Sequence, residues 1–240
     1  MIWECIFCST RNFGKYELQR ESMLCRKCRS TWRARATGLA VQQGLGYEIQ
    51  PYKSILSDWS RIGLGISDDI NLSVVLHSKF FYSNSYYDTF PYLDIREVPT
   101  VAKDCFEFVT CSDVLEHIDT RINEAFKGLR SLMKPSGFIV ASVPTSKTEE
   151  GHTEFYPDLD RFEIGLDGVH WFNKNGKQFI DHSPEFHGGR GQNLAFRQFS
   201  EVSLNSALIS AGFSEVVNLN FSSKLGVPEL EYPGVVIARC

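Results

Sequence analysis

The sequence predicts a doubly wound α/β domain with a small metal-binding module at its N-terminus. Strand-like apolar runs alternate with helix-like segments after about residue 45, which is typical of a largely parallel sheet covered by helices. The first 28 residues contain two Cys-x-x-Cys pairs, and 240 residues are enough for one such domain plus an appendage. We therefore expect a module and the start of a linking helix in residues 1–34, and the α/β domain in residues 35–240.

The N-terminal segment needs a metal or a cross-link, because it is polar and basic and has few aliphatic residues for a core. Two Cys-x-x-Cys knuckles separated by sixteen residues match the spacing of zinc ribbons and supply four tetrahedral thiolate ligands. We expect structural Zn²⁺ here, and two disulfides, an iron–sulfur centre or a redox pair are the alternatives. The predicted ligands are Cys5, Cys8, Cys25 and Cys28.

The basic residues of this segment have two interpretations. They could form a nucleic-acid-binding surface, or they could pair with acidic groups of the neighbouring domain, and we favour the second. The residues are Arg20, Arg26, Lys27, Arg29, Arg33 and Arg35. A net charge of -4 also disfavours a broad nucleic-acid-binding face. No apolar run is long enough for a membrane helix and no secretory signal is visible, so we expect a cytoplasmic protein without a membrane partner.

The remaining elements follow from periodicity and from helix start and stop signals. Residues 31–44 predict a helix that ends at Gly44 and Gly46. Residues 120–134 predict an amphipathic helix capped by Asp119 or Thr120, and residues 200–211 predict a helix that ends at Gly212. Apolar runs predict strands, and these lie at residues 59–66, 105–111, 138–143, 216–221 and 235–238.

The segment from Asp113 to Pro144, DVLEHIDTRINEAFKGLRSLMKPSGFIVASVP, resembles the centre of the class I S-adenosylmethionine-dependent methyltransferases. Members of that family typically combine Asp-x-Leu-Glu-His-Ile, an amphipathic helix, Leu-Lys-Pro-Gly-Gly and an apolar strand ending in Pro. Here the turn reads Met-Lys-Pro-Ser-Gly, which differs from that pattern at its first and fourth positions. The C-terminal helix and its Ala-Gly-Phe end are also similar to the family. The resemblance implies a Rossmann-like sheet of seven strands and S-adenosylmethionine as cofactor.

The resemblance also implies a set of cofactor-binding residues beyond the carboxyl ends of the strands. The glycine motif corresponds to IGLGISD, although the usual third glycine is replaced near Ser67, and the acidic residue for the ribose hydroxyls has Asn84 as its nearest candidate. Asp94 corresponds to the position beside the adenine amino group, and Asp113 begins the loop that faces the methionine part. The full predicted set is Gly63, Gly65, Ser67, Asn84, Asp94, Ser112, Asp113 and Leu115. Glu116 and His117 recur in the family without being general catalysts, and we expect His117 to be a loop residue.

About 55 residues lie between Pro144 and Phe199, where a minimal fold needs only a short crossover, and such insertions are usually functional. We expect the insertion, at about residues 145–198, to shape the acceptor pocket. Its candidate substrate-binding residues are His152, Tyr156, His170, Trp171 and Arg190. His187 lies in an HGGRG segment and is the candidate general base, with a structural hydrogen bond in a loop as the alternative. We expect no second metal site among these histidines, since none lie at typical ligand spacing.

Three functions remain open from the sequence. The first is methyl transfer to oxygen of a small molecule or glycan, favoured by the acidic charge and the aromatic insertion. The second is RNA methylation with the zinc module holding the RNA. The third is a non-catalytic protein of the same fold, suggested by the altered glycine motif. The first is our prediction, and the oligomeric state is left open.

Overall fold

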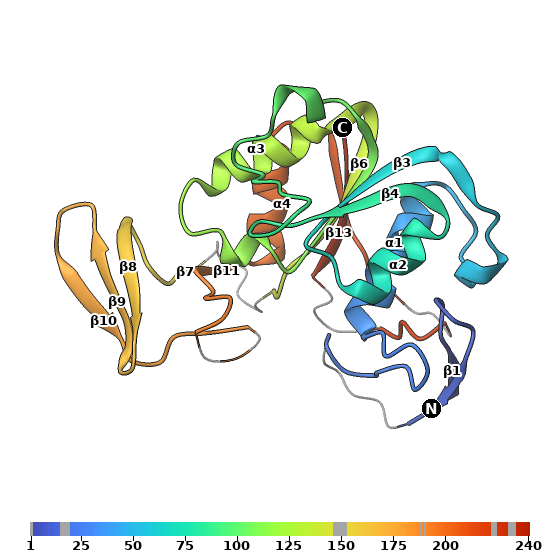
Figure 1. Ribbon diagram of the computed structural model, residues 1–240, viewed down its shortest axis with the longest axis horizontal. Helices are drawn as coiled ribbons and strands as arrows, with labels where there is room; N and C mark the ends of the chain where they lie inside the picture. Colours follow the sequence, from blue (N-terminus) through green and yellow to red (C-terminus); the bar gives the residue numbers. More distant parts are fainter. Residues whose placement is uncertain are drawn as a thin grey trace.

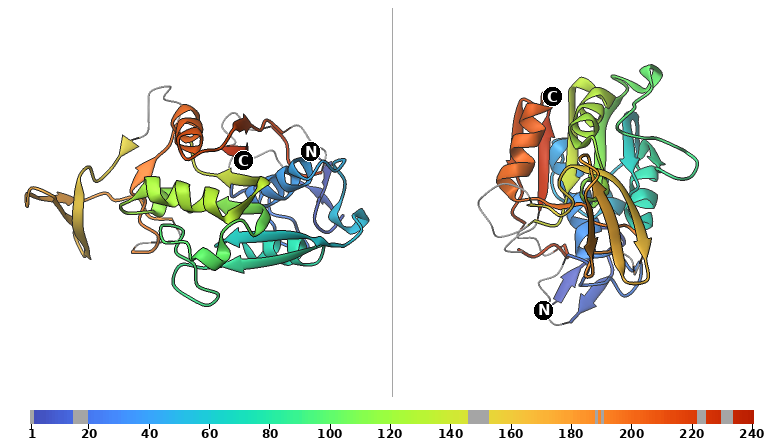
Figure 2. Two further views of the ribbon diagram at one scale, coloured as in Figure 1. Left: turned by 90° about the horizontal axis from the view of Figure 1, so that it is seen from above. Right: turned by 90° about the vertical axis from the view of Figure 1, so that its left-hand side faces the viewer.

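The computed structural model describes residues 2–14, 20–145, 153–187, 189, 191–221, 225–229 and 234–240. Its centre is a six-stranded sheet, with the N-terminal module beside one end and a separate small sheet projecting from the other (Figures 1 and 2). Among the described residues, none of the helices combines the length and the apolar composition that crossing a membrane requires.

The N-terminal module consists of two short antiparallel strands, β1 (Ile2–Glu4) and β2 (Arg11–Phe13), and the loop that brings the second cysteine pair beside the first. Arg35 fastens the module to the rest of the chain. Its guanidinium is fully buried, donates hydrogen bonds to the carbonyls of Met23 and Gly226, each at 2.8 Å, and lies 4.3 Å from the centre of the Trp3 ring. The carbonyl oxygens and the Trp3 ring compensate for the burial of the positive charge. The side chain of Arg35 therefore holds the module in a fixed position against the domain.

The expected linking helix is confirmed as α1 (Trp32–Gly44). Thr31 caps it, because its hydroxyl accepts a hydrogen bond from the Ala34 backbone N–H at 3.1 Å. Gly38 lies in the middle because a Cβ there would approach the Phe7 ring to 2.6 Å. The helix therefore packs closely against the module that precedes it.

The central sheet has the order β12-β13-β6-β5-β3-β4. The pairs β4–β3, β3–β5 and β5–β6 are parallel, and β13 joins antiparallel to both β6 and β12. Its strands are β3 (Asp58–Ile66), β4 (Phe80–Ser85), β5 (Phe106–Ser112), β6 (Met133–Ser142), β12 (Glu215–Asn218) and β13 (Val235–Arg239).

Six strands are found in the described residues, where seven were expected. The segment around Asp94, between β4 and β5, makes only an isolated bridge, between Tyr86 and Tyr92. The Asp94 carboxylate instead accepts a hydrogen bond from the Arg96 backbone N–H at 2.8 Å, which turns the chain two residues later. Pro91 has no N–H to give to a ladder, so the segment forms a loop over the sheet edge.

Helices cover both faces of the sheet, as a doubly wound fold requires (Figure 1). Alternate strand residues separate the two cores: Phe108 packs with α1 and α2, whereas Val109 packs with α3 and α4. The remaining helices are α2 (Ile70–His77), α3 (Ile122–Leu132), α4 (Glu201–Ser210) and the 3₁₀ turns η1 (Tyr52–Ser54), η2 (Thr100–Ala102) and η3 (Leu115–His117).

The start of α3 differs from the expectation. Its N-cap position is Arg121, in the left-handed region with φ 57°, and no side chain caps it. Asp119 is engaged elsewhere, because its carboxylate accepts from the Arg96 guanidinium at 2.7 Å. The strand β6 begins at Met133, directly after the last residue of α3, so the Lys-Pro-Ser-Gly segment lies within the strand. The expected helix near residues 200–211 is confirmed, with a capping box between Ser200 and Ser203.

The insertion after β6 builds a substructure of its own. Three antiparallel strands form a sheet of order β10-β9-β8, which projects from the domain (Figure 2). A second pair connects it to the domain. The strands are β7 (Thr153–Glu154), β8 (Leu159–Gly165), β9 (Gly168–Asn173), β10 (Gln178–Asp181) and β11 (Arg197–Gln198). An aromatic core, which includes Tyr156, Trp171 and Phe196, holds this part together.

Candidate functional site

A cavity of about 550 Å³ lies beyond the carboxyl ends of β3 and β5, between the domain and the insertion. This is the position where open α/β sheets bind ligands, and the volume is in the range of small-molecule sites. Its lining combines carboxylates and an arginine with aromatic and aliphatic side chains. The residues are Ile66, Ser67, Tyr87, Asp88, Leu93, Asp94, Ile95, Arg96, Asp113, Val114, His117, Ile118, Asp119, Phe162, Ile164, Gly191, Asn193, Leu194 and Phe196.

The loop after β3 is held by a polar network rather than by a third glycine. Ser67 has φ 54°, a conformation that glycine adopts more easily, and its N–H donates to the Ser85 carbonyl at 2.8 Å. Asn84 accepts from the Asp68 N–H at 3.0 Å and donates to the Asp68 carbonyl at 3.1 Å. Asn84 therefore supports the loop and is not among the residues that line the cavity, whereas Ser67 is.

Asp68 is a buried acid at the base of this loop. Burial raises the pKa of its carboxyl group to about 6, even though hydrogen bonds from Thr110 and Tyr82 act to lower it. Gly65 is required beside it, because a Cβ at that position would lie 2.1 Å from the Tyr82 hydroxyl. These hydrogen bonds thus hold the loop after β3 in its conformation, although the third glycine of the usual motif is missing.

Asp94 lines the opposite side of the cavity. Its carboxylate forms an ion pair of 2.9 Å with Arg96, whose guanidinium also lies 5.4 Å from the centre of the Tyr87 ring. Burial acts to raise the pKa of Asp94, but the hydrogen bonds from Arg96 outweigh it and hold that pKa below its ordinary value. Asp94 is therefore a fixed anion in the wall.

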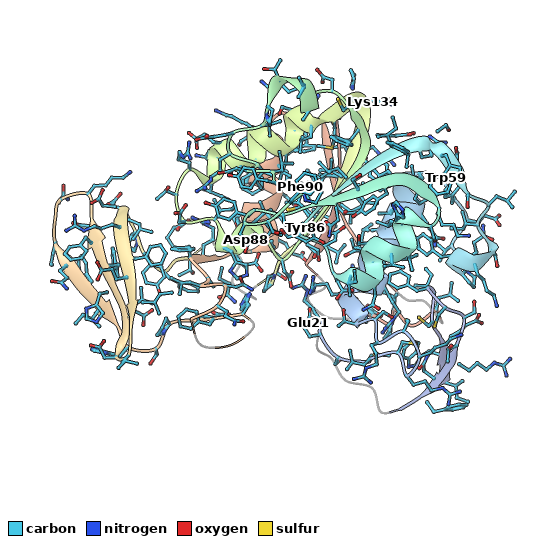
Figure 3. The ribbon with its side chains drawn as sticks, in the orientation of Figure 1. Glu21, Trp59, Tyr86, Asp88, Phe90 and Lys134 are labelled. Carbon is cyan, nitrogen blue, oxygen red and sulfur yellow. The ribbon has the colours of Figure 1, made fainter. Side chains whose placement is uncertain are left out.

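Asp113 begins the loop after β5 and has φ 55°. Its carboxylate pairs with two arginines of the N-terminal part, with Arg20 at 2.8 Å and with Arg33 at 3.0 Å. Arg33 also donates to the Ser112 hydroxyl at 2.8 Å and pairs with Glu21, which lies between the module and the sheet (Figure 3). The N-terminal module thus contacts the cavity loop, in line with the interpretation that its arginines pair with the neighbouring domain.

The other predicted cofactor-binding residues lie behind the cavity wall. A Cβ at Gly63 would lie 2.2 Å from the Phe108 ring, so Gly63 makes room for the core. Ser112 shares a hydrogen bond of 2.7 Å with the Ser142 hydroxyl, and Leu115 is fully buried. The structure therefore brings Ser67, Asp94 and Asp113 together at the cavity, and leaves the rest as supports.

The predicted substrate-binding residues do not line this cavity where they are described. The Tyr156 hydroxyl donates to Asp181 at 2.8 Å, and Trp171 stacks on Phe179 with ring centres 4.4 Å apart. His170 contacts the Asp167 carboxylate at 2.7 Å on the exposed side of the hairpin. His152 and Arg190 lie outside the described residues. The lining from the insertion comes instead from residues such as Phe162 and Phe196.

His187 meets His117 at the edge of the cavity. The Nδ1 atom of His187 lies 3.1 Å from Nε2 of His117, and both atoms lie 3.7 Å from the same carboxylate oxygen of Glu116. Glu116 is 2% exposed, and burial together with Asp113 raises the pKa of its carboxyl group to about 8. Burial also lowers the pKa of His117. Three groups that can bind a proton or a metal therefore share one small space.

Sequence reasoning missed this cluster and part of the cavity wall. Glu116 and His117 are separated from His187 by 70 residues, and only the pairing of the insertion with the loop after β5 brings them together. Asp88 lines the cavity from the loop after β4 (Figure 3). It lies three residues beyond the end of β4, a strand that the periodicity of the sequence did not predict.

The four N-terminal cysteines form one cluster. The Sγ atoms of Cys5 and Cys28 are 3.7 Å apart, and those of Cys8 and Cys25 are 3.6 Å apart. These distances exclude disulfides, whose sulfur atoms are about 2.05 Å apart, and all four cysteines are free. The cluster could hold a metal ion.

Comparisons with known proteins agree with this fold. A similar solved structure is a citrinin polyketide synthase CMeT domain (10% identity, TM-score 0.50, 88% of this chain and 52% of that one). Two others are the Burkholderia thailandensis 1,6-didemethyltoxoflavin-N1-methyltransferase with bound 1,6-didemethyltoxoflavin and S-adenosylhomocysteine (13% identity, TM-score 0.48, 86% and 77%) and the glycopeptide N-methyltransferase MtfA (12% identity, TM-score 0.49, 86% and 93%). No curated protein matches the sequence.

The model of a methyltransferase domain family matches residues 47–217, which is more than half of the chain and includes the strands and loops around the cavity. The match confirms what the segment from Asp113 to Pro144 predicted. The chain belongs to the methyltransferase domain family.

Proposed function

We propose that the protein transfers a methyl group from S-adenosylmethionine to an oxygen atom of a small molecule or glycan. The observation that carries the choice of oxygen is the cluster of Glu116, His117 and His187 at the cavity edge. A hydroxyl group must lose its proton during methyl transfer, whereas a neutral amine attacks without prior deprotonation. The names of the similar structures include N-methyltransferases, so the choice of oxygen rests on the residues of this chain.

The residues of the cavity suit the proposed cofactor. Ser67, Asp94 and Asp113 would hold it, with fixed carboxylates available to the hydroxyl and amino groups of a nucleoside. When bound, S-adenosylmethionine supplies an electrophilic methyl group on a positively charged sulfur. Phe162 and Phe196 would exclude water from the acceptor side and give a polar ring a flat apolar surface.

His187 is the group we propose to take the acceptor proton. Its Nε2 atom contacts the Glu185 carboxylate at 3.1 Å, which orients the ring and leaves Nδ1 directed at His117. A neutral imidazole has one ring nitrogen with an unshared electron pair, so it can accept a proton. The acceptor would then approach from the cavity, where His117 and Asn193 form part of the wall.

We also propose that the four-cysteine cluster binds structural Zn²⁺. In a tetrahedral site with Zn–S bonds of 2.3 Å, neighbouring sulfur atoms are about 3.8 Å apart, close to the 3.6 and 3.7 Å between the thiols here. Metal binding would supply the folding free energy that the small module lacks. Because Arg20 and Arg33 reach from this part of the chain to Asp113, zinc would also stabilise the cavity loop.

A screen of acceptor classes with methyl-labelled S-adenosylmethionine tests the proposed reaction. Polyhydroxylated small molecules and glycans, amines and RNA would each be incubated with the full chain, and the labelled product would be identified by mass spectrometry. We expect label on a hydroxyl oxygen. The His187→Gln variant should lower the rate about 10²- to 10⁴-fold without changing cofactor affinity, while His170→Gln serves as the control. Label only on RNA or on nitrogen would contradict the proposal.

A further inference from the structure

The cluster of Glu116, His117 and His187 has an unusual hydrogen-bond arrangement. Nδ1 of His117 lies 2.9 Å from the Leu194 carbonyl oxygen, and a carbonyl can only accept. Neutral His117 therefore carries its proton on Nδ1 and presents a lone pair at Nε2. Nε2 of His187 lies 3.1 Å from the Glu185 carboxylate, so neutral His187 presents its lone pair at Nδ1. The two lone pairs face each other across 3.1 Å.

The third member adds further unshared electron pairs to the same space. Neither carboxylate oxygen of Glu116 has a hydrogen-bond partner among the described residues, although the side chain is only 2% exposed. Buried carboxylate oxygens almost always have partners, and leaving them without any is costly. A cation placed among the three groups, a proton or a metal ion, would satisfy all of these unshared electron pairs.

We propose that Glu116, His117 and His187 bind one divalent transition-metal ion of the zinc type. The three facing atoms are separated by 3.1, 3.7 and 3.7 Å. A triangle with these sides has a circumscribed circle of about 2.0 Å radius, so one point lies at the Zn–N and Zn–O bond length from all three atoms. The three ligand atoms therefore already have the spacing that one such ion requires.

The surroundings of the ligands match those of known metal sites. A histidine ligand usually donates its other ring N–H to a carbonyl or a carboxylate, which fixes the tautomer and the ring orientation. Leu194 supplies the carbonyl for His117, and Glu185 supplies the carboxylate for His187. Two imidazoles and one carboxylate are a ligand set found in catalytic zinc sites, which keep a further position open. Here His117 lines the cavity, so the open position faces it.

The role of the ion rests on the proposed function, whereas its binding does not. An ion at this point would hold the acceptor oxygen and lower the pKa of the hydroxyl group, as metal ions do for bound water. With the ion bound, the lone pair of His187 is shared with the metal and the acceptor proton would pass to solvent; in the metal-free protein His187 takes that proton. This proposal departs from the expectation of no second metal site because His187 is 70 residues from His117 along the chain, so the spacing of ligands in the sequence does not reveal the cluster.

Metal stoichiometry of the full chain tests the site independently of activity. Equilibrium dialysis against Zn²⁺ followed by metal analysis should find two ions in the wild type and one in Glu116→Gln and in His187→Ala. His170→Ala, a histidine of the same insertion outside the cluster, should keep two. Cys25→Ser should keep the ion of this cluster. Equal metal content in the wild type and in Glu116→Gln would overturn the proposal.

Two further measurements guard against a loss of folding. Glu185→Gln changes a half-exposed carboxylate that only orients a ligand, and it should weaken Zn²⁺ binding at this site about 10- to 100-fold. Co²⁺ at this site should give a spectrum without the intense thiolate charge-transfer band of the cysteine cluster. S-adenosylhomocysteine affinity is measured in parallel: intact affinity with a single Zn²⁺ ion refutes the metal site alone, and lost affinity with two ions refutes the proposed function alone.

Discussion

The ion pair between Arg33 and Asp113 joins the N-terminal part of the chain to the cavity loop, and its removal should destabilise the fold measurably. The Arg33 and Asp113 side chains are 15% and 17% exposed, and their closest atoms are 3.0 Å apart. Asp113→Asn removes the charge, and asparagine tolerates the positive φ of this position better than alanine does. Arg33→Gln removes the other partner.

The expected coupling energy lies between two known limits. Fully exposed ion pairs contribute about 0.2–1 kcal/mol, and breaking a fully buried pair costs about 3–5 kcal/mol. A pair with most of its surface covered should therefore give a coupling of about 1.5 kcal/mol in a double-mutant cycle. Arg121 and Glu97 provide the control, because their ion pair is 2.9 Å long but 46% and 65% exposed.

Urea unfolding of the wild type, the two single variants and the double variant gives the coupling energy. The same cycle for Arg121→Gln and Glu97→Gln should give less than about 0.5 kcal/mol, and 1 M salt should abolish that smaller coupling first. A coupling for Arg33 and Asp113 no larger than that of the control pair would refute the reasoning, and would mean that the module and the cavity loop are independent.

Three more variants test other parts of the structure. Cys25→Ser should release the zinc ion of the cysteine cluster, whereas Cys105→Ser, outside the cluster, should keep it, as metal analysis after dialysis would show. Asp68→Asn should remove a pH dependence of stability. The folded-state pKa of about 6 exceeds the ordinary pKa of an aspartate, which is about 3.9. The folded form therefore binds the proton more tightly, and the wild type loses stability as pH rises from about 4 to about 6. Relative to the variant the loss should be about 3 kcal/mol, and a flat difference in urea unfolding free energies across this range would contradict it. Gly63→Ala should lower the free energy of unfolding by about 1–3 kcal/mol, because the added Cβ would lie 2.2 Å from the Phe108 ring. Gly14→Ala should lower it far less in the same assay, because the added Cβ would meet no described atom within 4 Å.

Local sequence signals predicted most of the fold. The helix at residues 31–44, the strands around residues 106–112 and 138–142 and the capped C-terminal helix depend on periodicity and on caps within the segment, and all appear in the structure. The start of α3 and the missing strand were not predictable in this way. Both depend on Arg96, whose guanidinium binds the carboxylates of Asp119 and Asp94 at once. Asp119 therefore does not cap α3, and the segment around Asp94 forms a turn instead of a strand.

The same difference between local signals and contacts of distant segments applies to the candidate site. Asp113 comes two residues after a predicted strand, and Asp94 was placed by the resemblance to the family, so both were expected at the cavity that they line. The partners that fix them come from elsewhere in the chain: Arg33 reaches Asp113 from the N-terminal part, and His187 reaches Glu116 from the insertion. Such contacts depend on how the insertion and the module fold back onto the sheet, and no spacing rule along the chain contains that information.

The account depends most on the claim that this cavity binds the methyl donor. Isothermal titration calorimetry of the full chain with S-adenosylhomocysteine tests it directly. We expect binding at one site, lost or greatly weakened in Asp94→Ala, whose carboxylate lines the cavity, and unchanged in Asp160→Ala, on the exposed face of β8. Absence of binding to the wild type, or equal affinity in the Asp94 variant, would contradict the account.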